Sequence, residues 1–241
     1  MTHKTTRRNA GPIVLGGEGL VCRVRPWPNQ PDTAHLVMYQ QIRPPTVAEL
    51  QRWSTELAEM GFLRVRTSAL GMDAGLRVRA VGFNQIQELF LLQHDAPRRV
   101  PTSGRPTGRL VLDQHRLAAD VDAAAFGAEW SLDADAIVEV RNATPRSRAR
   151  TAGDSPLQAY AITGRDGRQG FLQRLAVDPS HHREGLGLAL VRDSLNWLGR
   201  WRVAQVLVNT PTDNQPALAL YEQVGFRRLP ERLRVYEREL A

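Results

Sequence analysis

The sequence predicts a mixed α/β fold built from two similar halves, and three observations lead to this expectation. Residues 171–177 have the pattern of a strand that Asp178-Pro179 ends. A turn with two glycines then leads into apolar residues at helical spacing, residues 188–198, and a second strand follows at 204–209. A strand, helix and strand in this order predict a right-handed parallel crossover. The third observation is that the first half repeats this order.

The glycine turn lies where a strand passes into the first turn of a helix. The first backbone N–H groups of a helix have no internal partner, and the helix dipole places partial positive charge there. Gly185 and Gly187 would let an anion such as a pyrophosphate approach this backbone, and Arg183 could add a charged donor. An equally weighted alternative is a tight strand-to-helix turn. The chain lacks a Walker-type phosphate loop, and 201–205 lack the acidic residue of a dinucleotide fold.

Two motifs in the correct order resemble the GNAT acyltransferase superfamily, over roughly residues 106 to 241. Residues 175–179, Leu-Ala-Val-Asp-Pro, precede the turn His-Arg-Glu-Gly-Leu-Gly at 182–187. His182 departs from the Gln or Arg usual at that place, which concerns one side-chain contact. Downstream, Asn214 is followed seven residues later by Tyr221 and then by Gly225-Phe226.

This resemblance implies a GNAT fold and acetyl-CoA as the acyl donor. The fold has a central, mostly antiparallel sheet with one parallel, splayed strand pair, flanked by helices, and the pantetheine arm lies between the splayed strands. Tyr221 is implied as the acid that protonates the leaving thiolate, although a half-buried packing role is the alternative. The implied donor-binding residues are Leu175, Ala176, Val177, Arg183, Glu184, Gly185, Leu186, Gly187, Leu188 and Asn214.

No residue of the sequence stands out as the base that accepts the proton of the acceptor amine. Glu129, Glu139 and Asp178 are candidates, although an ordinary surface or capping carboxylate is the favoured interpretation of each. Arg174 alternates onto one face of its strand, where it could meet an anionic substrate or pair with a carboxylate. His181 and His182 are adjacent and point apart, so the sequence predicts no metal site.

The first half aligns with the second when it is shifted by 143 residues. Val65-Arg66-Thr67 then falls on Val208-Asn209-Thr210, and Val81-Gly82-Phe83 falls on Val224-Gly225-Phe226. Val78 stands where Tyr221 does, and Arg43-Pro44-Pro45 replaces the glycine turn. We therefore predict a tandem arrangement with a truncated, degenerate GNAT-like domain at 1–93, a linker at 94–108 and an acetyl-CoA-binding domain at 109–241. Chance similarity between short strand-helix-strand units is the alternative.

Charge and composition limit the classes of function. The net charge is +7, and residues 1–105 carry 14 basic and 8 acidic side chains against 18 and 17 in the remainder. Lys4 is the sole lysine, which codon bias explains better than a nucleic-acid surface, because no aromatic residues alternate with the arginines. A single cysteine, Cys22, indicates a reducing compartment. We expect a cytoplasmic protein without a membrane segment or targeting segment.

These observations together predict an N-acetyltransferase. The acetyl group would pass from acetyl-CoA to a primary amine by direct attack in a ternary complex. The first half would be a lid, a dimer surface or a wall of the acceptor site. The alternative is a non-catalytic module that binds acetyl-CoA or associates with nucleic acid, which the basic first half favours.

Overall fold

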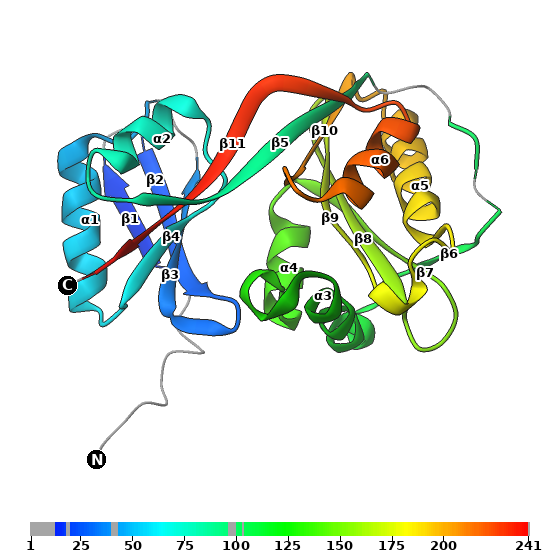
Figure 1. The fold of residues 1–241 in the computed structure, drawn as a ribbon, viewed down its shortest axis with the longest axis horizontal. Helices are drawn as coiled ribbons and strands as arrows, with labels where there is room; N and C mark the ends of the chain where they lie inside the picture. The colour runs from blue at the N-terminus through cyan, green and yellow to red at the C-terminus, as the bar shows by residue number, and fades with distance from the viewer. Residues whose placement is uncertain (1–12, 18–19, 40–42, 96–99, 103, 241) are drawn as a thin grey trace, which may run out of the picture. The chain divides into compact units, whose positions relative to one another are not determined.

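A computed structural model describes residues 13–17, 20–39, 43–95, 100–102 and 104–240 (Figure 1). The chain divides into two compact units. Unit 1 consists of Met1–Leu89 and Glu231–Ala241, and unit 2 consists of Phe90–Pro230. No helix in the described part of the chain is long and apolar enough to cross a membrane.

Unit 1 contains a mixed sheet with two helices. Its elements are β1 (Ile13–Gly17), β2 (Leu20–Trp27), β3 (Gln30–Tyr39), α1 (Val47–Glu59), β4 (Arg64–Thr67), α2 (Met72–Arg79) and the first part of β5 (Asn84–Asp95). The strands β1, β2 and β3 pair antiparallel in sequence, whereas β3 and β4 pair parallel, with Ala34 opposite Val65. The helix α1 therefore belongs to a parallel crossover, as the repeat predicted.

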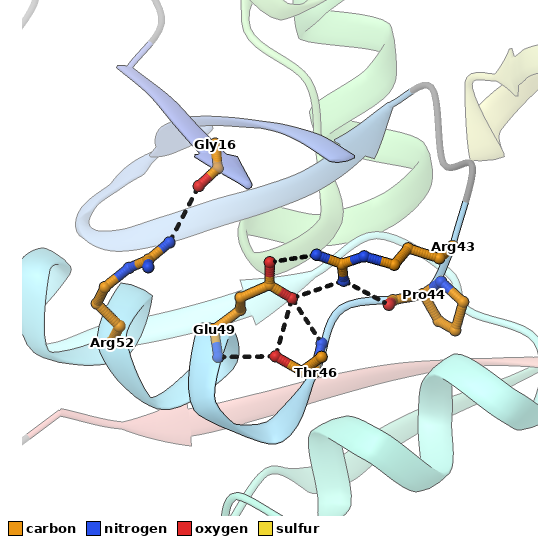
Figure 2. Close-up of polar contacts among 6 residues, drawn as sticks. All are labelled: Gly16, Arg43, Pro44, Thr46, Glu49 and Arg52. Carbon is orange, nitrogen blue, oxygen red and sulfur yellow. Dashed lines mark hydrogen bonds and ion pairs between the residues drawn. The ribbon is translucent and has the colours of Figure 1, made fainter. Parts of the chain in front are cut away.

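Helix α1 follows Thr46, a residue type that favours the N-cap position. The Thr46 hydroxyl accepts a hydrogen bond from the Glu49 N–H at 3.2 Å, and the Glu49 carboxylate accepts one from the Thr46 N–H at 2.8 Å (Figure 2). This reciprocal pair is a capping box. Leu50, Trp53 and Leu57 follow at helical spacing and are buried in the core of unit 1.

Unit 2 also contains a mixed sheet with helices. It contains β6 (Thr107–Arg109), α3 (His115–Trp130), α4 (Ala134–Asn142), β7 (Arg146–Ala152), β8 (Ala159–Asp166), β9 (Gln169–Val177), α5 (Leu186–Arg200), β10 (Gln205–Pro211) and α6 (Gln215–Gln223). The strands β6 to β9 pair antiparallel, and β9 and β10 pair parallel. This arrangement confirms the predicted mixed sheet with one parallel pair.

Two apolar clusters show that both faces of this sheet are covered. One cluster joins Leu190, Leu195 and Leu198 of α5 with residues of β9, β10 and α6. The other joins α3 and α4 with Tyr160 and Ala176 of the neighbouring strands. Side chains alternate across a strand, so the two clusters lie on opposite faces.

The last strand of the first half of the sequence and the last strand of the second half each pair with a strand of the other half. The final strand, β11 (Arg227–Glu239), pairs antiparallel with β4, with Arg238 opposite Val65. In the strand order β5 is in turn the neighbour of β10, and His94 of β5 contacts the Val224 carbonyl oxygen at 3.1 Å. Both strands therefore continue from one compact unit into the other (Figure 1).

The compact units differ from the predicted domain ranges 1–93, 94–108 and 109–241 in two places. Residues 231–241, which we placed in the second domain, belong to unit 1. The predicted linker also overlaps regular structure, because β5 continues to Asp95 and β6 begins at Thr107. Residues 96–99 and 103 of this linker lie outside the described residues. Both differences arise from strand pairing between distant segments, which local periodicity does not report.

Candidate active site

The strands β9 and β10 separate after a short paired stretch. Gln205, Val206 and Leu207 pair with Gln169, Gly170 and Phe171. Beyond these pairs β9 continues to Val177 and β10 to Pro211, with no further pairing between them in this described segment. The β10-facing edge of Leu175–Val177 therefore lies outside the sheet ladder, which is the splayed geometry that the resemblance implied.

A β-bulge lies in β9 just before this edge. Ile162 of β8 pairs with Arg174, whereas the next residue, Thr163, pairs with Leu172, so Gln173 is the extra residue. A bulge bends its strand and re-aims the side chains beside it. Here Leu172 joins the apolar cluster of α5, and Arg174 contacts residues of α3.

The predicted anion turn lies between the end of β9 and the start of α5. Asp178 accepts a hydrogen bond from the Ser180 N–H at 2.9 Å, which begins the 3-10 turn Pro179–His181. Arg183 and Gly185 then have positive φ angles of 67° and 83°. Gly185 is the N-cap of α5 and gives it no side-chain hydrogen bond. The first N–H groups of α5 are therefore not capped by the residue that precedes them.

The lack of a side chain at Gly187 allows neighbouring elements to pack closely. A Cβ atom at this position would lie 3.2 Å from Leu220 Cδ2 and 3.6 Å from Val177 Cγ2. The start of α5, the end of β9 and α6 therefore meet at this glycine. This close approach brings residues 175–177 and 183–188 together with the helix that carries Tyr221.

Polar side chains in and near the turn contact neighbouring residues. His182 Nε2 lies 3.3 Å from the Val177 carbonyl oxygen, and His181 Nδ1 lies 3.1 Å from Glu184 Oε1. The two histidines therefore have separate partners, in agreement with the expectation that they point apart. Arg105 donates from Nε to the Glu184 carbonyl oxygen at 3.1 Å, a contact that sequence reasoning missed. Within the described residues no group of histidine, cysteine and carboxylate side chains could hold a metal ion.

Tyr221 lies in α6 with only 5% of its surface exposed. Its ring centroid is 5.6 Å from that of Phe226, and its hydroxyl has no hydrogen-bond partner among the residues that the structure describes. Burial raises the pKa of Tyr221 well above its usual value near 10, and the charge of Arg174 opposes this rise. The phenol therefore keeps its proton across the physiological pH range.

Asn214 is the N-cap of α6. Its side-chain oxygen accepts a hydrogen bond from the Ala217 N–H at 3.1 Å. The amide oxygen is therefore engaged within the protein, and the NH2 group is the part that could meet a ligand. Its predicted contact with pantetheine stays a prediction.

Arg174 pairs with a carboxylate, which is one of the two outcomes considered for it. Its Nε and one terminal nitrogen lie 2.8 and 2.5 Å from the two oxygens of Asp122, which is 0% exposed. Burial alone lowers the pKa of Arg174, but the hydrogen bonds and charge of Asp122 outweigh it and raise that pKa. The guanidinium is therefore always charged. Asp122 was missed by sequence reasoning, because Asp120 lies two residues before it, is exposed, and has the same kind of neighbours.

The three candidate bases occupy surface or capping positions. Glu129 and Glu139 are exposed on α3 and α4. Asp178 accepts hydrogen bonds from the hydroxyl and the N–H of Ser180, which lower its pKa. Its role as a capping carboxylate, the alternative interpretation, accounts for these contacts.

A family model matches the segment that forms this site. Residues 120–226 match the model of the Acetyltransferase (GNAT) family, which covers the bulge, the glycine turn and Tyr221. This segment of the chain therefore matches the GNAT family. A solved tandem GNAT protein from the clavulanic acid biosynthesis pathway superposes with a TM-score of 0.63 at 14% identity, over 92% of this chain and 79% of that one. This likeness confirms the predicted tandem fold.

Curated relatives match about a third of the chain. The [ribosomal protein bS18]-alanine N-acetyltransferase of Escherichia coli K12 is 35% identical over 80 residues, which are 33% of this chain and 54% of the relative. The N-alpha-acetyltransferase RimI of Mycobacterium tuberculosis is 37% identical over 92 residues, 36% of this chain and 55% of the relative. The chain therefore spans about half the length of these two relatives.

Proposed function

We propose that this GNAT protein is an N-acetyltransferase that moves an acetyl group from acetyl-CoA to a primary amine. The observation that carries the proposal is the end of β9–β10 pairing at Leu207 and Phe171. The unpaired end of β9 leads to the uncapped start of α5, and α6, which meets that helix start, carries the buried Tyr221. An unpaired strand edge, a group of free helix N–H donors and a neutral phenol are the three features that a bound acetyl thioester needs.

Each part of acetyl-CoA would contact a different group of residues in this arrangement. The pyrophosphate would accept hydrogen bonds from backbone N–H groups of residues 183–188, where the helix dipole favours negative charge. The pantetheine arm would lie between the splayed strands and use the unpaired backbone edge of β9. The thioester carbonyl oxygen would accept from an N–H group near Leu175–Val177, a contact worth about 3–4 kcal/mol as negative charge develops.

The transfer would proceed by direct attack within the ternary complex. The neutral amine forms a bond to the thioester carbonyl carbon, and the C–S bond of the tetrahedral intermediate then breaks. Tyr221 gives its proton to the departing thiolate, and the proton of the attacking amine leaves to water. The raised pKa of Tyr221 keeps the phenol protonated until this step.

The names of the curated relatives support an acceptor class. One is an N-alpha-acetyltransferase by its name, and the other is an N-acetyltransferase of an alanine of ribosomal protein bS18. We propose the free α-amine of a peptide or protein N-terminus as the acceptor to test first. Acceptor pockets of a shared fold vary with their loops, so the fold itself does not choose among amines.

The donor site is tested by calorimetric titration of acetyl-CoA. Wild-type protein is expected to bind one equivalent, and Gly187→Glu is expected to lose binding because it adds bulk and negative charge at the start of α5. Gly16→Glu is the matched control, since a side chain at Gly16 meets nothing within 4 Å. Absence of binding to the wild type would refute the proposal.

The reaction is tested by release of free coenzyme A thiol with peptides as acceptors. A peptide with a free N-terminus and the same peptide with a blocked N-terminus form the matched pair. Turnover of only the free peptide supports the proposed acceptor class. Equal turnover of both, through a lysine side chain, would support amine transfer but refute that class.

A non-catalytic module is the second candidate, favoured by the excess of basic side chains in residues 1–105. Binding of acetyl-CoA without turnover of any amine would support it. Retention of the protein on immobilised DNA or RNA that weakens steeply with salt would add nucleic acid as its partner.

A further inference from the structure

Tyr221 lies in the last turn of a short helix. Helix α6 has nine residues, Gln215–Gln223, and a helix of this length is marginal unless tertiary contacts hold it. The last carbonyl groups of a helix have no partner within it, so its end is held only when other groups bind these carbonyls. The position of the Tyr221 phenol therefore depends on how the C-terminal end of α6 is held.

The chain leaves α6 through a Schellman motif, a common way to end a helix. The Phe226 N–H donates to the Tyr221 carbonyl oxygen at 3.0 Å. The Gly225 N–H donates to the Glu222 carbonyl oxygen at 3.0 Å, and Gly225 has the positive φ, 97°, that this motif favours. The rings of Phe226 and Tyr221, with centroids 5.6 Å apart, form the apolar contact that often accompanies the motif. The carbonyl of Val224, the C-cap residue, takes no part in these bonds.

His94 of β5 binds this remaining carbonyl. Its Nε2 lies 3.1 Å from the Val224 carbonyl oxygen, and because a carbonyl oxygen only accepts, Nε2 carries the hydrogen and donates it. The His94 ring also lies edge-to-face on the Phe226 ring, with centroids 5.1 Å apart. A Cβ atom on Gly225 would lie 3.2 Å from His94 Nε2, so the glycine makes room for the histidine. His94 therefore lies against the three residues that follow α6, all of them in unit 2.

The His94 ring is buried and neutral. Only 7% of its surface is exposed, and burial lowers the pKa of His94 below its usual value. The hydrogen bond with Val224 opposes this decrease of the pKa. Asp95 and Arg227 pair with each other, and their charges act on the pKa of His94 in opposite directions. The neutral ring with its hydrogen on Nε2 is therefore the form that holds the end of α6 near pH 7.

We propose that His94 is a positioning residue for the acetyl transfer, which binds the C-terminal end of α6 and thereby holds the Tyr221 phenol in place for proton donation. His94 contacts the Phe226 ring, and Phe226 contacts both the ring and the carbonyl oxygen of Tyr221. Proton transfer needs donor and acceptor within hydrogen-bond reach, so a small displacement of the phenol slows it. This inference rests on the proposed function. It assigns a role to a residue outside both family motifs, at the start of the predicted linker.

The test uses two substitutions of similar size at position 94. His94→Gln keeps an N–H donor near the place of Nε2, whereas His94→Leu removes the donor to the Val224 carbonyl oxygen. His94→Phe, which keeps a ring against Phe226 but has no donor, replaces His94→Leu if that protein does not fold. The control is His115→Leu, at another buried histidine of unit 2, which lies on α3.

The measurements are kcat with a working amine acceptor and the calorimetric Kd for acetyl-CoA, on variants that circular dichroism shows to be folded. For His94→Leu we expect kcat to fall about tenfold with a Kd within about threefold of wild type, because the geometry of proton donation changes and donor binding does not. His94→Gln should retain most of kcat, and His115→Leu should leave kcat unchanged.

A double-mutant cycle with Tyr221→Phe tests whether His94 acts through the phenol. The Tyr221→Phe protein has no phenol to position, so adding His94→Leu to it should change kcat by less than about twofold. An undiminished loss of kcat in this background would mean that His94 acts independently of Tyr221, and the inference would be wrong.

Two further outcomes would overturn the inference while the proposed function stands. One is a folded His94→Leu protein with wild-type kcat. The other is an equal loss of kcat in His94→Gln and His94→Leu, because the packing of the ring and not its hydrogen bond would then be responsible. If the wild type neither binds acetyl-CoA nor turns over an amine, the proposed function itself fails, and this inference fails with it.

Discussion

The two helices that follow a parallel-paired strand, α1 in unit 1 and α5 in unit 2, begin in opposite ways. At α1 the Glu49 carboxylate folds back onto the helix start, and Arg43 donates two hydrogen bonds to it at 2.8 and 2.7 Å (Figure 2). Glu49 is only 12% exposed, and the hydrogen bonds from Arg43 and from the Thr46 N–H lower its pKa to about 2. At α5 the N-cap is Gly185, which offers no side chain.

This difference shows how one position of a repeated fold becomes open or closed to an anion. A permanent carboxylate occupies the positive end of α1, so a pyrophosphate would meet repulsion there. Pro44 and Pro45 further remove two N–H donors from the preceding segment. At α5 the corresponding donors are left for a ligand. We therefore expect that the first half does not bind coenzyme A.

Replacing the candidate acid should have the largest effect. Tyr221→Phe keeps the ring and its packing against Phe226 but removes the proton donor. We expect kcat to fall about 100-fold, with the affinity for acetyl-CoA unchanged. Steady-state kinetics and calorimetry measure the two quantities, and Tyr236→Phe, in unit 1, is the matched control. A kcat of Tyr221→Phe equal to wild type would reduce Tyr221 to a packing residue like Val78, its counterpart in unit 1.

A carboxylate in the first turn of α5, like that of Glu49 in α1, should weaken acetyl-CoA binding. Leu188 is the third residue of α5, as Glu49 is the third residue of α1. Leu188→Glu is expected to weaken acetyl-CoA binding about tenfold, because the new charge competes with the pyrophosphate for the helix start. Calorimetry against Leu188→Gln, which has similar size and no charge, isolates the electrostatic effect. Equal affinities in the two variants would argue against pyrophosphate binding at this turn.

Removing the carboxylate from α1 should have the smallest effect. Glu49→Gln is expected to lower the free energy of unfolding by about 1 kcal/mol through loss of the charged cap. Because the pKa of Glu49 is about 2, below the roughly 4.3 of an unfolded chain, its contribution is full above pH ~4.3. The difference between the two proteins should then shrink as pH falls toward 2. Denaturant unfolding at several pH values checks this trend.

The same variant sharpens the comparison of the two helix starts. Glu49→Gln should still bind a single equivalent of acetyl-CoA, because Pro44 and Pro45 still lack N–H donors. A second equivalent in calorimetry would mean that Glu49 by itself had closed a working site in unit 1.

The sequence by itself determined those features of this protein that depend on neighbouring residues, such as helix caps and turns. Thr46 and Asp133 belong to the residue types that favour N-caps, and both side chains accept backbone hydrogen bonds in that role. Proline after β9, the glycine turn and the apolar spacing of α5 likewise placed the candidate donor site. These signals act within one or two helical turns, so the order of residues is sufficient to read them.

Only the tertiary structure decided the features that join distant segments. The pairing of β11 with β4, the bulge at Gln173 and the buried Asp122–Arg174 pair each depend on residues far apart in sequence. No local pattern reports such contacts, because a strand has the same alternation whichever neighbour it pairs with. A carboxylate on a helix likewise reads as exposed until its partner strand is placed beside it.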